Sequence, residues 1–171
     1  MILSDADIRQ GITTGSISID PFKLPHLNPA SYTLTLGSRL FIPTPSKMID
    51  STNPRVAYEE IEIPQDGYLV EPGVFLLGSA AEQLGIATSL AARLDARTSL
   101  ARLGLNVLQG STHIEPGQSK SHETLEITNI SHSPILIHAG MKIVKVVFVR
   151  LSSPATKGYA GAYRGQKHGR I

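Results

Sequence analysis

Proline interrupts this chain along most of its length and limits the helices that it can form. The 11 prolines lie between positions 21 and 154, and each lacks a backbone N–H and clashes with the preceding helical turn. Short apolar or alternating runs, typical of strands, lie between them at residues 31–36, 68–77, 124–128, 135–137 and 143–149. The run 68–77 fits two strands around a Glu-Pro-Gly turn. Short strands at a spacing of roughly ten residues predict a mainly β sandwich or barrel, one domain over residues 1–171.

Two windows leave room for a helix. Ser4, followed three residues later by Asp7, is a capping pattern that predicts an N-terminal helix, which Gly11 can end. Residues 90–105 have the composition of a single amphipathic helix, but they also fit a strand and then a short helix that begins at Thr98 and ends at Gly104. We favour the strand and short helix, because Thr98 and Ser99 suit a helix start.

The absence of cysteine excludes several kinds of site. Disulfides and thiolate metal sites cannot form, and the zinc nucleobase deaminase signature requires a Pro-Cys-x-x-Cys segment. We therefore expect no zinc and no metal bound by protein side chains. No apolar run approaches about 18 residues and no basic-then-apolar leader is present, so we expect no membrane span and a cytoplasmic location.

Charge is unevenly distributed although the net charge is only +2. No Asp or Glu follows Glu126, whereas basic residues continue at Lys142, Lys145, Arg150, Lys157, Arg164, Lys167 and Arg170. This stretch suits an anionic partner, either a phosphate ligand or nucleic acid, but it also fits a solvated tail. Aromatic residues form 5% of the chain and Trp is absent, so we expect no nucleic acid partner.

The segment 97–102 (RTSLAR) is the densest cluster of candidate binding residues. Arg97 and Arg102 bracket Thr98 and Ser99 at an expected helix N-terminus, where free backbone N–H groups favour an anion. Guanidinium groups add bidentate phosphate contacts. Taken without any family resemblance, a capped surface helix with solvated arginines is the stronger interpretation of the same residues.

Glu126 is the candidate for proton transfer. On a strand, Leu125 and Ile127 face one side, and Thr124, Glu126 and Thr128 face the other. If the second side is a pocket wall, desolvation suits the glutamate to act as a general base. If that side meets solvent, Glu126 is an ordinary polar residue.

Taken in order, these segments resemble the dCTP deaminase family of the dUTPase superfamily almost end to end. The most specific match is 97–105 (RTSLARLGL). The others are 1–8 (MILSDADI), 19–22 (IDPF), 29–37 (PASYTLTLG), 71–73 (EPG), 114–117 (IEPG), 124–126 (TLE), 140–141 (GM), 151–154 (LSSP) and the tail from Tyr159 through 163–166 (YRGQ).

The resemblance implies a fold and an assembly. The fold is a dUTPase-like distorted jelly roll, with a short N-terminal helix and one short internal helix. The assembly is a homotrimer with active sites between subunits, in which residues 155–171 form a mobile tail that closes over the nucleotide. The ligand implied is a deoxypyrimidine nucleoside triphosphate, with Mg²⁺ bound through its phosphates.

The resemblance also implies roles for individual residues. The glutamate that matches Glu126 activates a water that attacks C4 of cytosine and then relays the proton so that ammonia leaves, while Arg102 and Thr98 match groups that place the water and the base. The remaining implied nucleotide contacts are Arg97, Ser99, Ser111, Glu115, Thr124, Tyr159 and Gln166.

Several positions depart from the family pattern. Residues 108–111 (LQGS) replace a His-Val-Thr-Ala segment, and one extra residue between Gln118 and Glu126 leaves the strand register open. Single departures are Thr33 and Glu115 for aspartate, Gln118 for an aromatic residue and Ala162 for lysine. Four hypotheses follow: a dCTP deaminase, with or without onward hydrolysis of dUTP to dUMP and pyrophosphate; a dUTPase; an enzyme with an altered substrate; and a non-catalytic nucleotide-binding homologue.

Overall fold

The computed structural model describes residues 1–46, 48–52, 56–108, 110 and 112–161. Most of its strands form one 10-stranded antiparallel sheet, in the order β8-β10-β6-β3-β12-β7-β9, with β1, β2 and β4 attached at its sides; β5 and β11 form a separate pair. The strands are β1 (Ile17–Asp20), β2 (Leu27–Asn28), β3 (Ser31–Pro43), β4 (Tyr58–Glu62), β5 (Tyr68–Val70), β6 (Phe75–Ile86), β7 (Leu90–Ala96), β8 (Leu105–Asn106), β9 (His113–Ile114), β10 (Ser121–Asn129), β11 (Ile135–Ile137) and β12 (Lys142–Arg150). The helices are α1 (Asp5–Thr14), the 3₁₀ turn η1 (Leu24–His26) and α2 (Thr98–Ala101).

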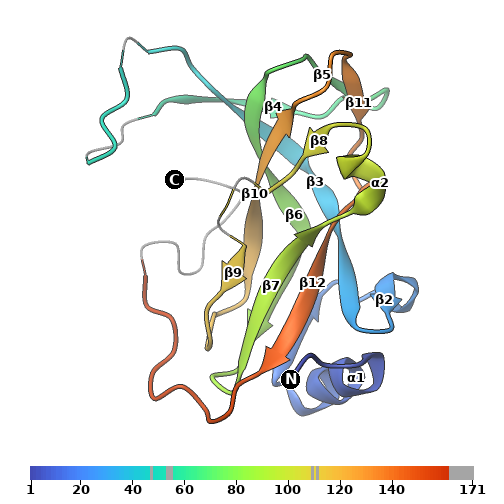
Figure 1. Ribbon diagram of the computed structural model, residues 1–171, viewed down its shortest axis with the longest axis vertical. Coiled ribbons are helices and arrows are strands. Elements are labelled where there is room, and N and C mark those ends of the chain that lie inside the picture. The colour runs from blue at the N-terminus through green and yellow to red at the C-terminus, as the bar shows by residue number, and fades with distance from the viewer. Residues whose placement is uncertain (47, 53–55, 109, 111, 162–171) are drawn as a thin grey trace.

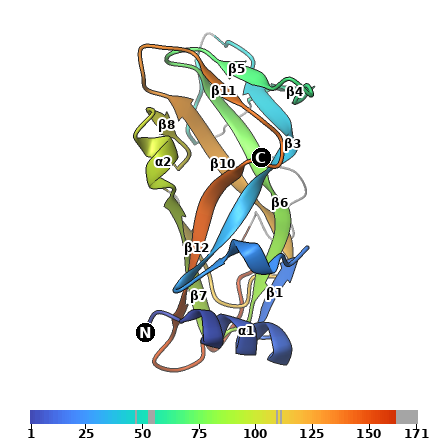
Figure 2. The ribbon, with the colours of Figure 1, turned by 90° about the vertical axis from the view of Figure 1, so that its right-hand side faces the viewer.

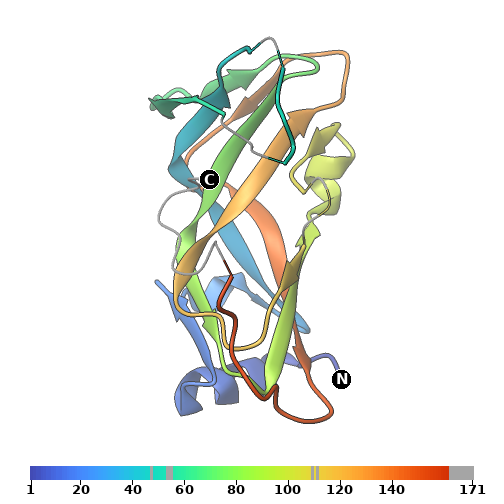
Figure 3. The same cartoon turned by 90° about the vertical axis from the view of Figure 1, so that its left-hand side faces the viewer.

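The sheet is rolled about the long axis of the molecule, with α1 at one end (Figures 1, 2 and 3). The long strand β3 joins its two halves. Near its start, Tyr32 to Thr35 pair with β12, and further on Leu36 to Pro43 pair with β6 and β4. The mainly β class with one short N-terminal and one short internal helix is thus confirmed.

The core lies inside this roll and is filled by alternate residues of the strands. These side chains are almost wholly buried: Leu34, Leu36, Leu76, Leu84, Leu125, Ile127, Val144, Val146 and Phe148. Full burial of such a side chain stabilises a fold by about 1.5–3 kcal/mol. Where this alternation holds, the residues between them are directed away from the core and are available for a site.

The N-terminal helix begins as predicted but ends later. Ser4 Oγ accepts from Asp7 N at 3.3 Å, and Ser4 N donates to the Asp7 carboxylate at 3.1 Å, which completes a capping box. The expectation that Gly11 ends the helix is wrong. Gly11 lies inside α1, where a Cβ would come within 2.8 Å of Ile17, and Gly15 caps the helix with a φ of 77°. Within the described residues no helix combines the length and apolar character needed to cross a bilayer.

The five predicted strand regions are all confirmed. Residues 68–77 contain the whole of β5 and the start of β6, and residues 90–105 contain β7 followed by α2, with Gly104 at a φ of 85°. Strands β2, β8 and β9 were not predicted, because each has only two residues and is too short to show an alternating pattern. Strand β4 escaped because its sequence, YEEIE, is mostly charged.

Candidate active site

A cavity of about 600 Å³ lies on the side of β10 that faces away from the core. Phe75 and Leu77 of β6, Leu94 of β7 and Ile114 of β9 supply apolar surface. Polar and aromatic residues complete the wall: Tyr58, Thr112, His113, Glu115, Gln118, Ser121, His122, Glu123, Thr124, Glu126 and Tyr159. The cavity therefore combines an apolar surface with several carboxyl groups.

Strand β10 places Glu126 in this wall. Leu125 and Ile127 are fully buried in the core, whereas Thr124 and Glu126, on the other side of the strand, line the cavity. Glu126 lies opposite Leu77 of β6 in the strand register. The two faces predicted from the alternation of this segment are thus present, and the face that carries Glu126 is a pocket wall.

The start of β10 departs from regular alternation. His122 pairs with Gln83, but Thr124 pairs with Ser79, so the register of β10 against β6 shifts between them. The three consecutive residues His122, Glu123 and Thr124 consequently all line the cavity. From Thr124 to Thr128 the pairing is regular, which fixes the register that the extra residue in this segment had left open.

Glu123 is a candidate functional residue that the sequence analysis missed. Gln118 Nε2 donates a hydrogen bond to Glu123 Oε1 at 2.5 Å. Burial raises the pKa of Glu123 to about 7, although the hydrogen bond from Gln118 opposes the shift. The sequence did contain an indication of this residue. By strict alternation Glu123 falls on the same side of the strand as the core residues Leu125 and Ile127, where an acidic side chain is unexpected.

Two further predicted residues reach the cavity from outside β10. Glu115 follows β9, and its carboxylate lies 3.6 Å from His113 Nε2. Tyr159 comes from the start of the tail, where its backbone N–H donates to Pro116 O at 2.8 Å. The tail approaches closely there, since a Cβ on Gly117 would lie 2.6 Å from Gly158 Cα; Figure 3 shows this segment running beside β9 and β10.

Some predicted features lie outside the described residues, namely Ser111, Gln166 and the departure at Ala162. The closing movement predicted for residues 155–171 stays a prediction.

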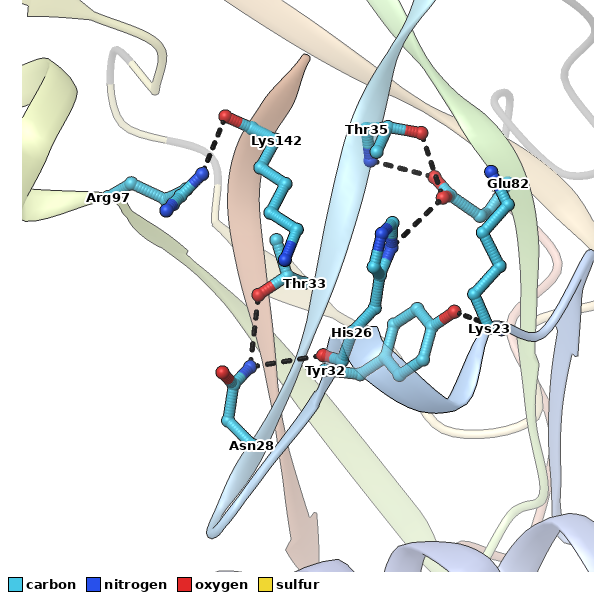
Figure 4. Close-up of polar contacts among 9 residues, drawn as sticks. All are labelled: Lys23, His26, Asn28, Tyr32, Thr33, Thr35, Glu82, Arg97 and Lys142. Atoms are coloured by element: carbon cyan, nitrogen blue, oxygen red, sulfur yellow. Dashed lines mark hydrogen bonds and ion pairs between the residues drawn. The ribbon is translucent and has the colours of Figure 1, made fainter. Parts of the chain in front are cut away.

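The α2 residues lie apart from the cavity. Among the described residues that line it, none belongs to the segment 97–102. Thr98, Ser99 and Arg102 are exposed, and Arg97 Nη1 donates to the backbone carbonyl of Lys142 at 3.0 Å (Figure 4). A single chain therefore brings together Glu115, Thr124, Glu126 and Tyr159 but leaves Arg97, Thr98, Ser99 and Arg102 on a separate surface.

Comparison with known proteins decides the family. A family model described as dCTP deaminase-like matches residues 2–151. The chain belongs to the dCTP deaminase-like family. A relative from Mycobacterium avium named "dCTP deaminase, dUMP-forming" is 37% identical over 172 residues, which cover 98% of this chain and 90% of the relative.

Solved structures agree on the fold. A 2'-deoxycytidine 5'-triphosphate deaminase from Agrobacterium tumefaciens superposes with a TM-score of 0.68 at 22% identity, over 86% of this chain and 47% of that chain. A dUTPase from Staphylococcus bacteriophage 80alpha gives a TM-score of 0.51 at 12% identity, over 82% of this chain and 94% of that chain. At these identities the likeness concerns the fold alone.

One departure from the dCTP deaminase pattern, Thr33, lies in a polar cluster beside β3 (Figure 4). Asn28 Nδ2 donates to Thr33 Oγ1 at 3.0 Å. Nearby, the fully buried Glu82 accepts from Thr35 N and Thr35 Oγ1, both at 2.8 Å. His26 Nδ1 lies 3.9 Å from Glu82, and burial, reinforced by Lys142, lowers the pKa of His26. This cluster joins η1, β3 and β6 and contributes no residue to the cavity wall.

Proposed function

We propose that this chain converts dCTP to dUMP in two hydrolytic steps, deamination of the base and release of pyrophosphate, without zinc. The observation that carries the proposal is Glu126, a carboxylate on the wall of a cavity in a dCTP deaminase-like chain. Relatives that match almost the whole chain bear the name of this dUMP-forming activity. Of the hypotheses from the sequence, a deaminase with onward hydrolysis is thus favoured.

The size and lining of the cavity support a nucleotide ligand. About 600 Å³ falls within the roughly 300–1,000 Å³ of small-molecule sites. Phe75, Leu77, Leu94 and Ile114 offer apolar contacts to a pyrimidine ring, and the Glu115 carboxylate is an acceptor suited to a sugar hydroxyl.

Glu126 serves the deamination as a general base. Its carboxylate takes a proton from water, whose oxygen attacks C4 of cytosine to form a tetrahedral centre. The glutamic acid then gives this proton to the amino group, the C–N bond breaks to release ammonia, and the second proton of the water passes to N3 as the C4=O bond of uracil forms. A positioned general base contributes about 10²–10⁴-fold to such a rate, and placement of the water and base supplies much of the remainder.

The separate position of α2 supports a site shared between subunits. In a homotrimer, α2 of a neighbouring subunit would bring Arg102 and Thr98 to the attacked water and the base, and Arg97 and Ser99 to the phosphates. Guanidinium groups suit this task because they bind phosphate oxygens in pairs. Ser111, Thr124, Tyr159 and Gln166 are assigned to the nucleotide in the same proposal.

We also propose that Mg²⁺ binds together with the nucleotide, through its phosphates. In the described ranges, no set of three or more His, Asp or Glu side chains is placed to hold a metal ion. The triphosphate oxygens would hold Mg²⁺, which would supply positive charge to neutralise the phosphates. The protein's own part is to bind the phosphates through the α2 arginines.

The test is to incubate the purified protein with Mg²⁺ and either dCTP or dUTP, and to measure ammonia, pyrophosphate and nucleotide products. Ammonia and dUMP from dCTP, with pyrophosphate release, are expected. Ammonia with dUTP as the end product would restrict the activity to deamination. Pyrophosphate from dUTP without ammonia from dCTP would identify a dUTPase, and silence with both nucleotides would contradict the proposal.

A further inference from the structure

Gln118 and Glu123 form a fixed polar pair on the cavity wall. Both side chains line the cavity, and the amide of Gln118 donates to Glu123 Oε1 at 2.5 Å and to Ser121 Oγ at 3.3 Å. Glu123 belongs to the same strand as Glu126 and stands at the register shift that directs consecutive residues toward the cavity. The position of this carboxyl group is therefore set both by the strand and by a hydrogen-bonded neighbour.

We propose that Glu123, held by Gln118, is a specificity-determining residue that reads the N3 and N4 edge of cytosine and favours dCTP over dUTP. The inference rests on the proposed function and deepens it, because it names a group that recognises the base. Nothing in the family resemblance assigns a role to this residue, and Gln118 itself departs from the family pattern.

The chemistry of the pair matches cytosine. A protonated carboxyl group offers one O–H donor beside one carbonyl acceptor. Because the Gln118 amide donates to Oε1, that oxygen is held as an acceptor and the proton is favoured on Oε2. The acid can then donate from Oε2 to cytosine N3 and accept from the N4 amino group at Oε1.

Uracil presents the reverse order on the same edge. Its N3–H is a donor and its O4 is an acceptor, so the O–H and the carbonyl of the acid would have to exchange places. The exchange would put the proton on Oε1 and break the hydrogen bond from Gln118. A bound uracil would otherwise leave buried polar groups unpaired, which is the usual physical origin of strong discrimination.

The protonation state supports this assignment. Burial raises the pKa of Glu123 to about 7, so a large fraction of the group is a neutral acid near neutral pH. Above that pH the carboxylate loses its donor and presents only acceptors to N3, which is itself an acceptor. Recognition of cytosine should therefore weaken as pH rises through about 7. The other titratable groups on the cavity wall are Tyr58, His113, Glu115, His122, Glu126 and Tyr159.

The test compares wild type with Glu123→Val, Glu123→Gln and the control Glu62→Gln, which alters an exposed glutamate of β4. The readouts are kcat/KM for ammonia release from dCTP and for pyrophosphate release from dUTP. We expect Glu123→Val to lower the dCTP to dUTP preference by about 10- to 100-fold, as for the loss of paired polar contacts. Glu123→Gln should retain the preference, since its amide still offers a donor and an acceptor, and Glu62→Gln should match wild type.

The pH profile separates recognition from a purely structural role. Wild type should lose dCTP kcat/KM as pH rises from about 6 to about 9, whereas Glu123→Gln should lack this decline because its amide does not titrate. Gln118→Leu should move the decline to higher pH, since the hydrogen bond from Gln118 holds the pKa of Glu123 down. A decline that persists in Glu123→Gln would assign it to another cavity group and overturn the proposal.

Binding to inactive protein keeps this test independent of turnover. Calorimetry with Mg²⁺ and dCTP or dUTP, in a Glu126→Gln background, measures the base preference directly. An unchanged preference in Glu123→Val would overturn the inference even if the proposed function holds. If wild type releases no ammonia, the proposed function fails, but a binding preference lost in Glu123→Val would still support the reading of cytosine by Glu123. If Glu123→Val does not fold, the pH profile of Glu123→Gln decides.

Discussion

The wall of β10 and the surface of α2 carry the two halves of the candidate active site, and they differ in how far one chain completes them. On β10, the fold itself supplies a cavity, a neighbouring sheet strand and fixed partners for the carboxyl groups. On α2, Thr98, Ser99 and Arg102 are exposed. The contrast teaches that one folded chain brings the β10 residues together in a cavity but leaves the α2 residues apart from it, and our proposal of a site shared between subunits rests on this difference.

The largest effect should come from Glu126→Gln, which removes the base and keeps the shape of the side chain. Turnover of dCTP should fall by at least about 10²–10⁴-fold, while nucleotide binding measured by calorimetry stays largely intact. Near-normal ammonia release in this variant would show that Glu126 is not the general base, and the proposed role of β10 in the reaction would then fail.

Arg102→Ala tests the other half. We expect turnover to fall by about 10²-fold, the scale for losing one positioned electrostatic contact, without change in the sedimentation of the assembly. If the variant sediments as a monomer, Arg102 is a structural residue of the interface, and the assignment of α2 to catalysis fails.

Mixing the two variants tests whether the halves belong to different subunits. Each variant alone should retain about a hundredth of the wild-type activity or less. Unfolding and refolding them together in equal amounts would create sites with an intact Glu126 from one subunit and an intact Arg102 from another. Random assembly of closed trimers would restore about a quarter of the wild-type activity. Activity no higher than that of separately refolded variants would place both halves in the same chain.

The smallest effect on catalysis should come from Glu82→Gln, which alters a buried carboxyl outside both regions. Glu82 accepts two hydrogen bonds from Thr35, and its loss should lower the free energy of unfolding by about 1–3 kcal/mol, measured by urea denaturation. Turnover per folded molecule should not change. A large loss of kcat would show that the cluster around Glu82 communicates with the cavity.

Much of this architecture was readable from local sequence patterns. The capping box at Ser4, the alternation in β10 and the break between β7 and α2 each depend on residues a few positions apart, and each prediction was confirmed. The prediction that Gly11 ends the helix was wrong because this glycine lies inside the helix and packs closely against Ile17. No local sequence pattern reveals such a packing contact.

The candidate site was harder to predict than the fold. Glu123 reaches the cavity through a register shift between β10 and β6, which depends on strands far apart in sequence. The separation of α2 from the cavity is also a tertiary property. The motif at 97–102 identified candidate binding residues as a group, but it carried no information on where they lie relative to the cavity.

The passage of β3 from one half of the sheet to the other has a consequence for how the molecule opens. Its first residues pair with β12, near the end of the described chain, and its later residues pair with β6 and β4. The two halves of the roll cannot separate without releasing hydrogen bonds of this strand, so the amides of its buried residues Tyr32 to Leu36 should exchange with solvent deuterium only through global unfolding. Pairings so distant along the chain also predict slow folding, in which the roll closes late.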